Sequence, residues 1–419
     1  MKRAICLTVF LALCCAAIAS GAAQKKKTKK PPPAPRVTAA QRAAARAEIA
    51  RRMAAAGDEF EKPEALDPFF AALADSAKPI HILQFGDSHT ASDDWVDSMR
   101  APLQRKFGDG GPGFVQAGRP YRGYRRFDAR TNQSTGWVTQ GTMAERGDPN
   151  QGLSGVSIST SYANQTVTFE ASGTSLTLFY LQQPAGGQID ITADGQDLGP
   201  VTTQGDPAPA AMTWTLLPGP HEIALRTLDN GWVRLFGWTL DNPTGLTFET
   251  LGINGAQANV ILGWDETLWA TEVKARNPGL VLLAYGTNEA NSHLWTLEQF
   301  RLDMKAVIDR IRRAAPQAAI LLIGPPDCGK LRPLLHLADV VAAERDIARE
   351  QQVAFWDLRR HMGGPGAVKL WVTAGYGQAD YIHMTGEGYR LTGESIVNAL
   401  LEREKRHEQA REDQARENR

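Results

Sequence analysis

Five short apolar runs, separated by helical segments, constrain the fold of this chain more than any other feature. Most are continuous in apolar or branched residues, as is typical of parallel strands buried on both faces. They cover residues 79–85, 246–253, 279–284, 318–323 and 353–357. Segments of helical character lie at 93–107, 297–314, 335–351 and from 386 past 401. This alternation predicts an α/β domain, a parallel sheet with helices on both faces.

The first run leads directly into Gly86-Asp87-Ser88. Glycine allows a sharp turn after the strand, which places Ser88 at the strand's carboxyl end, where open α/β sheets hold their ligands. A serine there is a candidate nucleophile. It needs a general base, a group that orients the base and donors for an oxyanion.

Three polar blocks further along the chain can supply these groups. They are Gly252-Ile-Asn-Gly255, Gly286-Thr-Asn-Glu289 and Asp380-Tyr-Ile-His383, of which the first two follow predicted strands. Gly-Asp-Ser, a glycine block, Gly-Thr-Asn-Glu and Asp-x-x-His, in that order, resemble the SGNH (GDSL-like) hydrolase family. In that family the four blocks converge on one ester-cleaving site.

The resemblance implies a flavodoxin-like three-layer sandwich and a serine-esterase site without a cofactor. In such a site Ser88 is the nucleophile, His383 takes and returns its proton, and Asp380 holds the imidazole. The oxyanion would be met by the N–H groups of Ser88 and Gly255 and by the side-chain amide of Asn288.

We expect no metal site in this chain. The candidate ligands His89, His293 and His336 lack carboxylate or cysteine partners at ligand spacing.

Residues 128–243 have a different pattern of polar and apolar residues, which predicts an inserted all-β domain. Short runs at 156–160, 166–170, 175–181 and 189–193 alternate polar and apolar residues between Gly, Pro and Asn turns, as in a β-sandwich. The stretch 217–225 resembles the late strands of jelly-roll carbohydrate-binding modules. Trp214, Trp232 and Trp238 are candidates for stacking on sugars, with burial in the sandwich core as the alternative. SGNH hydrolases with such an insert include the periplasmic peptidoglycan O-acetylesterases, which this architecture resembles.

The start of the chain has the layout of a secretory signal peptide. A basic Met1-Lys-Arg precedes an apolar run to Ala19 and small residues to Ala23, and the run is too short for a comfortable membrane span. We therefore expect a periplasmic or cell-envelope protein with no membrane span after signal cleavage. The predicted segments are a signal peptide 1–23, a basic proline-rich linker 24–36, a helical segment 37–77, a first hydrolase part 78–127, the inserted sandwich 128–243, a second hydrolase part 244–401 and a charged tail 402–419.

The insert is expected to be separable from the hydrolase. Its two ends must lie near one another, because the blocks on either side of it reach the same site. A domain joined at two nearby points can be removed without breaking the core of its parent.

Charge and cysteine content restrict the partners. Residues 1–36 hold eight of the 46 basic residues and no acidic ones, so the remainder has 38 basic against 46 acidic residues, a net charge of −8. This excess argues against nucleic acid as a partner. Three of the four cysteines lie in the signal segment, which leaves Cys328 alone and predicts no intramolecular disulfide.

The predicted function is removal of O-acetyl groups from a cell-envelope glycan, peptidoglycan foremost. Arginines interleave with aromatic residues at 118–127, so Arg119, Arg122 and Tyr124 are candidates for contact with a carboxylate-bearing glycan or peptide. An ordinary charged loop is the alternative.

Other functions stay open. They are another SGNH carbohydrate esterase, an O-acetyltransferase for exported polysaccharide, and a glycan-binding wall protein without activity. The position of Asp-x-x-His after the serine favours hydrolysis over transfer, and the complete set of blocks speaks against an inert protein.

Overall fold

The computed structural model describes residues 37–57, 60–74, 77–141, 147–293, 296–329 and 336–417. All its helices and strands lie in one compact unit, Thr38–Arg419. The predicted signal peptide and all of the linker, residues 1–36, lie outside the described residues. No helix in the described part of the chain is long and apolar enough to cross a membrane.

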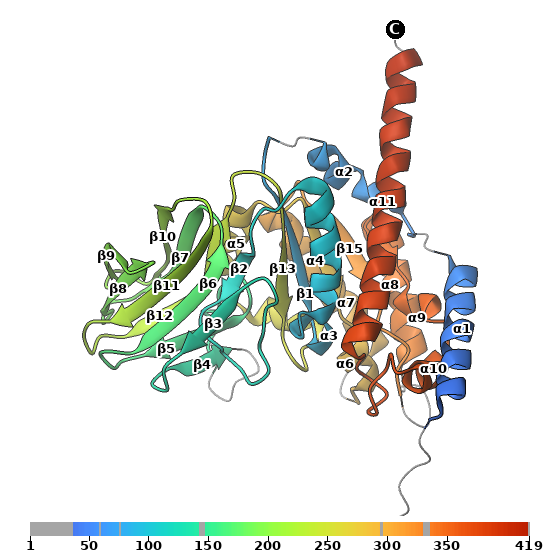
Figure 1. Ribbon diagram of the computed structural model, residues 1–419, viewed down its shortest axis with the longest axis horizontal. Helices are drawn as coiled ribbons and strands as arrows, with labels where there is room; N and C mark the ends of the chain where they lie inside the picture. Colours follow the sequence, from blue (N-terminus) through green and yellow to red (C-terminus); the bar gives the residue numbers. More distant parts are fainter. Residues whose placement is uncertain are drawn as a thin grey trace, which may run out of the picture. The chain divides into compact units, whose positions relative to one another are not determined.

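The five predicted apolar runs form one parallel sheet (Figure 1). Along the chain its strands are β1 (Ile80–Gly86), β13 (Leu246–Gly252), β14 (Leu280–Ala284), β15 (Ala319–Ile323) and β16 (Ala354–Trp356), and across the sheet the order is β13-β1-β14-β15-β16. By chain order within this sheet the arrangement is 2-1-3-4-5, the flavodoxin-like order. The predicted α/β fold class is confirmed.

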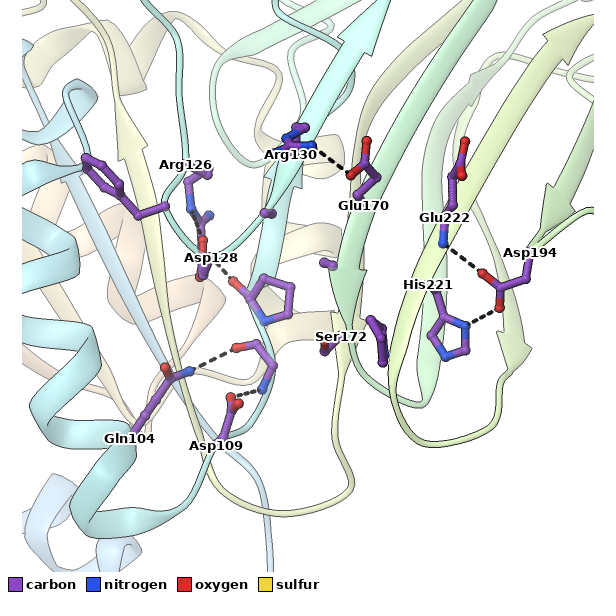
Figure 2. Close-up of a pocket in the computed structure, with 16 residues that line it drawn as sticks. Gln104, Asp109, Arg126, Asp128, Arg130, Glu170, Ser172, Asp194, His221 and Glu222 are labelled. Carbon is purple, nitrogen blue, oxygen red and sulfur yellow. Dashed lines mark hydrogen bonds and ion pairs between the residues drawn. The ribbon is translucent and has the colours of Figure 1, made fainter.

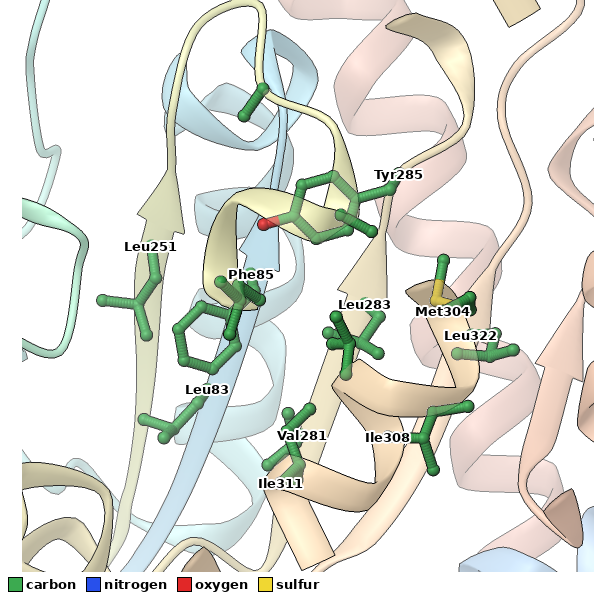
Figure 3. Packing of buried hydrophobic residues seen from close by; sticks show 14 of the residues in the cluster. Leu83, Phe85, Leu251, Val281, Leu283, Tyr285, Met304, Ile308, Ile311 and Leu322 are labelled. Atoms are coloured by element: carbon green, nitrogen blue, oxygen red, sulfur yellow. The ribbon is translucent and has the colours of Figure 1, made fainter. Parts of the chain in front are cut away.

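Side chains alternate between the two faces of this sheet with the period of two that a strand imposes. Ile80 and Ile82 belong to one buried apolar cluster, and Leu83 and Phe85 belong to the other. The first cluster includes side chains of α1 (Ala39–Ala56), α2 (Asp67–Leu73), α4 (Asp94–Phe107), α10 (Ala367–Ala374) and α11 (Gly386–Glu417). The second includes α5 (Glu266–Arg276), α7 (Leu297–Ala314) and α8 (Leu337–Gln351), as Figure 3 shows in part. Both faces are therefore covered, which makes three layers.

Short helices occupy the connections. They are η1 (Pro63–Leu66), α3 (Ser88–Ala91), η2 (Ala258–Gly263), α6 (Thr287–Asn291) and α9 (Leu358–His361). α3 and α6 directly follow β1 and β14, so each begins at the carboxyl edge of the sheet.

The inserted region is a sandwich of two antiparallel sheets. One contains β2 (Gly113–Gln116), β4 (Val138–Gly141), β5 (Val156–Thr160), β7 (Ser175–Gln182), β10 (Ala208–Thr215) and β12 (Val233–Asp241). The other contains β3 (Arg130–Gln133), β6 (Thr166–Ser172), β8 (Gln188–Ala193), β9 (Gln196–Thr202) and β11 (Pro220–Thr227). The predicted all-β insert is confirmed as part of the fold class.

The three tryptophans of the insert have different surroundings. Trp238 is fully buried and stacks on Phe169, with ring centroids 5.9 Å apart. Trp214 packs partly buried against the sandwich core and donates its indole N–H to the carbonyl of Leu198. Trp232 is 50% exposed, so of the three it is the one whose ring remains available at the surface.

The sandwich sheet starts earlier than residue 128, where the sequence pattern places it. β2 lies at Gly113–Gln116 and pairs with the last strand of the insert, β12. A four-residue strand next to a glycine-rich loop is too short to show alternation, which explains why the pattern does not reveal it.

The packing argues against the expectation that the insert is separable, because the two parts share an apolar core. Phe179 and Phe236 of the sandwich belong to the same cluster as Trp264 and Trp269, which also hold one face of the parallel sheet through Phe85. Glu272 of α5 also accepts a hydrogen bond from the N–H of Leu153, at 2.5 Å. Removing residues 128–243 would expose these tryptophans to water.

We therefore predict that a variant with residues 128–243 replaced by a short Gly/Ser linker does not fold to a native catalytic domain. Loss of the shared core should leave it insoluble, or soluble with apolar surface that binds a hydrophobic dye and without cooperative unfolding. Far-UV circular dichroism, dye binding and hydrolysis of a chromogenic acetate check this. A soluble variant with cooperative unfolding and wild-type turnover of the acetate would contradict it.

Candidate active site

Two glycines at the ends of neighbouring strands position Ser88. β1 ends at Gly86 and β13 at Gly252, and the two residues are paired in register. A Cβ on Gly86 would lie 2.1 Å from Oγ1 of Thr90, and one on Gly252 would lie 2.2 Å from the backbone nitrogen of Ala91. The absence of a side chain at both positions lets α3 pack directly on the strand ends. Ser88, the first residue of α3, is thereby held at the carboxyl edge of the sheet.

The structure brings the three predicted catalytic residues into one hydrogen-bonded line. Oγ of Ser88 lies 2.8 Å from Nε2 of His383, and Nδ1 of His383 lies 2.7 Å from Oδ2 of Asp380. With the proton of the neutral ring on Nδ1, facing the carboxylate, Nε2 has a lone pair that accepts the serine O–H. Such a line can remove the hydroxyl proton as Oγ attacks a carbonyl carbon.

Asp380 holds the turn as well as the imidazole. Its Oδ1 accepts hydrogen bonds from the N–H groups of Ile382 (2.9 Å) and His383 (3.0 Å). Partial burial opposes ionisation, but the hydrogen bonds from the His383 side chain and from both backbone N–H groups prevail, so the pKa of Asp380 lies below its ordinary value. The carboxylate therefore stays charged beside the ring, where it can stabilise an imidazolium.

The predicted oxyanion donors lie at neighbouring strand ends. Gly255 is exposed and has a φ of 78° in the loop after β13, a conformation that favours glycine. Its N–H and that of Ser88 have no backbone acceptor among the described residues. Asn288, in α6, donates its amide to the carbonyl of Ala256 at 2.9 Å and faces Oδ2 of Asp87 at 3.4 Å. The longer of these two contacts is the one that a substrate oxygen can replace.

The neighbours of Ser88 are buried, and the sequence pattern gives no role to one of them, His89. Oδ1 of Asp87 accepts the N–H of His89 at 2.9 Å. Burial has the larger effect on the pKa of Asp87 and raises it to about 6, although that hydrogen bond lowers it. Nδ1 of His89 lies 2.9 Å from the Tyr389 hydroxyl, and its ring centroid is 5.3 Å from that of His383. Burial lowers the pKa of His89 to about 3, so a neutral ring packs against His383.

An open cavity of about 320 Å³ adjoins Ser88 and His383. Asn254 and Arg125 are among the residues that line it. Arg125 donates to the carbonyl of Ser92 at 2.9 Å and forms an ion pair with Asp94, while about half of its side chain stays exposed. The cationic side chain in the lining is therefore Arg125, which sequence reasoning did not distinguish from the other arginines of the segment.

The predicted substrate-contacting residues lie elsewhere in that segment. Arg119 and Arg122 are exposed and are not among the residues that line the cavity. Tyr124 is buried, and its hydroxyl accepts the N–H of Gln116 at 3.1 Å. Tyr124 therefore has a structural contact in this loop and does not reach the cavity.

A larger groove of about 870 Å³ separates the end of α4 from the second sandwich sheet and also presents a serine, a histidine and an aspartate (Figure 2). His221 lies 2.7 Å from Asp194 through Nδ1 and 2.7 Å from the carbonyl of Leu217 through Nε2. Burial works against the charged ring, but these two acceptors prevail and raise the pKa of His221 above its ordinary value. Its Nε2 is thus a donor and cannot serve as a base for Ser172, in contrast to His383.

Among the described residues, no three or more histidine, cysteine, aspartate or glutamate side chains are grouped so that they could hold a metal ion. Cys328 is buried and free.

Comparison with known proteins adds three findings. The model of the GDSL-like lipase/acylhydrolase family matches residues 205–391, which include Gly255, Asn288, Asp380 and His383 but begin after Ser88. A solved peptidoglycan O-acetylesterase matches with 27% identity and a TM-score of 0.70, over 81% of this chain and 96% of that one. Comparison with curated proteins finds no match.

Two family two carbohydrate esterases are remote structural matches. The enzyme from Clostridium thermocellum has 13% identity and a TM-score of 0.29, over 63% of this chain and 97% of its own. The enzyme from Cellvibrio japonicus has 11% identity and a TM-score of 0.29, over 66% of this chain and 98% of its own.

We predict that Gly252→Ala lowers turnover of a chromogenic acetate by about a hundredfold, because the added methyl group meets the backbone of Thr90 and Ala91 and displaces the short helix α3 that begins with Ser88. Gly279→Ala is the matched control, since a Cβ there meets its nearest atoms at 3.4 Å, an ordinary contact. Steady-state kinetics on both purified variants check the prediction. Equal turnover in the two variants would show that the close approach of α3 does not position the serine.

Proposed function

We propose that this chain, an esterase of the SGNH (GDSL-like) hydrolase family, removes O-acetyl groups from a cell-envelope glycan, peptidoglycan foremost. The hydrogen-bonded line Ser88–His383–Asp380 at the carboxyl edge of the sheet is the observation that carries the esterase chemistry. The choice of peptidoglycan is supported by the solved peptidoglycan O-acetylesterase, which matches most of both chains.

The proposed reaction has two halves. Oγ of Ser88 attacks the acetyl carbonyl carbon while Nε2 of His383 takes the hydroxyl proton. The tetrahedral intermediate collapses as the bond to the sugar oxygen breaks, and Nε2 returns the proton to that oxygen. Water then attacks the acetyl-serine with His383 again as the base, which releases acetate and restores Ser88.

The negative oxygen of each tetrahedral intermediate would lie between the N–H groups of Ser88 and Gly255 and the amide of Asn288. Each donor stabilises negative charge that develops in the transition states and the tetrahedral intermediates and is absent from the bound ester, and the loss of one such donor typically lowers turnover by about a hundredfold or more. Asn288 would redirect the N–H that faces Asp87 and keep the hydrogen bond to Ala256.

Location and substrate are proposed together. The signal-peptide pattern of residues 1–23 supports export, and the acetylated wall glycan lies outside the inner membrane. The alternatives are a different acetylated polysaccharide as substrate, or a sugar hydroxyl in place of water as acceptor of the acetyl group. We favour water because the Asp-x-x-His block follows the serine in the chain.

Ser88→Ala should lower turnover of a chromogenic acetate by about ten-thousandfold or more, because no other hydroxyl replaces the nucleophile. Ser172→Ala is the matched control and should leave turnover unchanged, since the histidine beside Ser172 cannot act as a base. Thermal unfolding of both variants shows whether they are folded. If folded Ser88→Ala retains wild-type turnover, Ser88 is not the nucleophile.

On natural substrates, acetate should be released faster from O-acetylated peptidoglycan than from acetylated xylan at equal acetyl content. Both reactions should disappear in Ser88→Ala, which controls for spontaneous loss of acetate. Equal or faster release from xylan would reassign the protein to another class of carbohydrate esterase without changing the catalytic mechanism.

A further inference from the structure

Two predicted oxyanion donors come from separate connections and need a fixed separation. Gly255 belongs to the loop after β13, and Asn288 belongs to α6 after β14, so no covalent neighbour sets the distance between them. Two short side-chain hydrogen bonds join the connections. Asn288 donates to the carbonyl of Ala256 at 2.9 Å, and Glu289 accepts the N–H of Ala258 at 2.8 Å.

Glu289 is the member of this pair that does not itself have to meet the substrate. Its Oε1 accepts the N–H of Ala258 in the loop after β13, while its Oε2 accepts the N–H of Gly286 at the start of α6, at 2.9 Å. The residue is only 4% exposed. One carboxylate thus has one oxygen on each of the two blocks that supply oxyanion donors.

We propose that Glu289 is a positioning residue that holds the Gly255 N–H and the Asn288 amide at the separation that the oxyanion requires. The inference rests on the function proposed above, because it takes Ser88 as the nucleophile. A plain helix cap would need only the Gly286 contact. The second contact, to the loop that carries Gly255, is what links Glu289 to catalysis.

The carboxyl group of Glu289 bridges the N–H groups of Ala258 and Gly286, and its charge controls this bridge. Burial raises the pKa of Glu289 to about 7, against the hydrogen bonds from the Ala258 and Gly286 N–H groups. The titratable groups that act on it or are influenced by it are Asp87, Tyr285 and Glu344. Only the ionised form offers two good acceptors, since a proton turns one oxygen into a hydroxyl. The bridge is therefore complete above about pH 7 and weakened below it.

The test is Glu289→Gln, which keeps the shape of the side chain but replaces one acceptor by an NH₂ group. We expect kcat for a chromogenic acetate to fall by about tenfold to a hundredfold with KM within about twofold, because only transition-state stabilisation is lost. Titration of active sites with a serine-reactive organophosphonate corrects for misfolded enzyme. Glu272→Gln is the matched control, since Glu272 is also a buried glutamate that accepts a backbone N–H, but in α5 away from the site. It should leave kcat unchanged.

Two further measurements separate positioning from plain stabilisation. In an Asn288→Ala background, Glu289→Gln should lower kcat by less than about threefold. The effects of residues that act together on one oxyanion donor are not additive, and that donor is already absent from the Asn288→Ala enzyme. The ratio of wild-type to Glu289→Gln kcat should be largest above about pH 7 and should narrow toward about pH 6, since any pH dependence common to both enzymes cancels in the ratio. If Glu289→Gln does not fold, Glu289→Asp, which keeps both acceptors on a shorter side chain, replaces it in the measurement in the Asn288→Ala background.

Each of three results would overturn the inference. They are an unchanged kcat in folded Glu289→Gln, losses in kcat that multiply in the Asn288→Ala background, and a ratio of wild-type to Glu289→Gln kcat that does not change with pH. Its failure is distinguishable from failure of the proposed function. If Ser88→Ala is inactive and Glu289→Gln is unaffected, only the positioning role is wrong. If Ser88→Ala stays active, the catalytic assignment itself fails.

Discussion

The packing of Trp264 and Trp269 is the interaction on which the arrangement of the whole molecule depends. Both rings contact Phe85, with centroid separations of 6.5 and 5.9 Å, and Phe85 lies three residues before Ser88 in the sequence. The same apolar cluster also contains Phe179 and Phe236 of the sandwich. Arg310 completes this packing, because its buried guanidinium donates to the carbonyl of Trp264 at 2.7 Å and lies over the Trp269 ring. The insert is therefore part of the core that supports the strand leading to Ser88.

The order of the strands then determines which side chains can meet. β1 lies between β13 and β14, so the loops that follow these three neighbouring strands carry the serine, glycine and asparagine blocks side by side. This is the switch point at which flavodoxin-like sheets hold their ligands. The fourth block reaches the same edge by a different route. α11 packs against α4, and the Tyr389 hydroxyl in the first turns of α11 lies 2.9 Å from Nδ1 of His89 in α3. These contacts hold the start of α11, which directly follows the His383 block, beside the helix that carries Ser88.

The strands of the parallel sheet and the meeting of the four blocks could be predicted from the sequence, because both depend on local features. Continuous apolar runs predict buried strands, and the residues that follow them share one edge. Contacts between distant segments could not be predicted in the same way. Arg125 and Arg126 are adjacent and alike in sequence, yet Arg126 is buried against Asp93 and Asp128 while Arg125 faces the cavity.

One overlooked signal concerns the shared core. In β12, Leu235 and Phe236 are successive large apolar residues, although a sandwich strand with one face in water alternates polar and apolar. Leu235 enters the sandwich core and Phe236 the cluster that contains Trp264. Two buried faces on one strand indicate a third layer, and here that layer is the hydrolase itself.

The polar groups behind the site work against the stability of the fold. Burial raises the pKa of Asp87 to about 6, that of Glu289 to about 7, and that of Glu344 well above its ordinary value, with Glu289 adding to the last shift. An unfolded chain ionises such carboxyl groups freely near pH 4 to 4.5, so at these groups it binds fewer protons than the folded chain. Their contribution to the free energy of unfolding therefore falls as pH rises from about 4 to about 7.

The bridging form of Glu289 is nevertheless the ionised one. The conditions that complete the bridge are therefore those in which these buried acids destabilise the fold. Apolar packing must offset that cost, and Figure 3 shows where it lies, with Leu283 and Tyr285 of the strand that leads to α6 packed in the same cluster as Met304 and Ile308 of α7. The predicted oxyanion donors thus depend for their support on the apolar core beneath them.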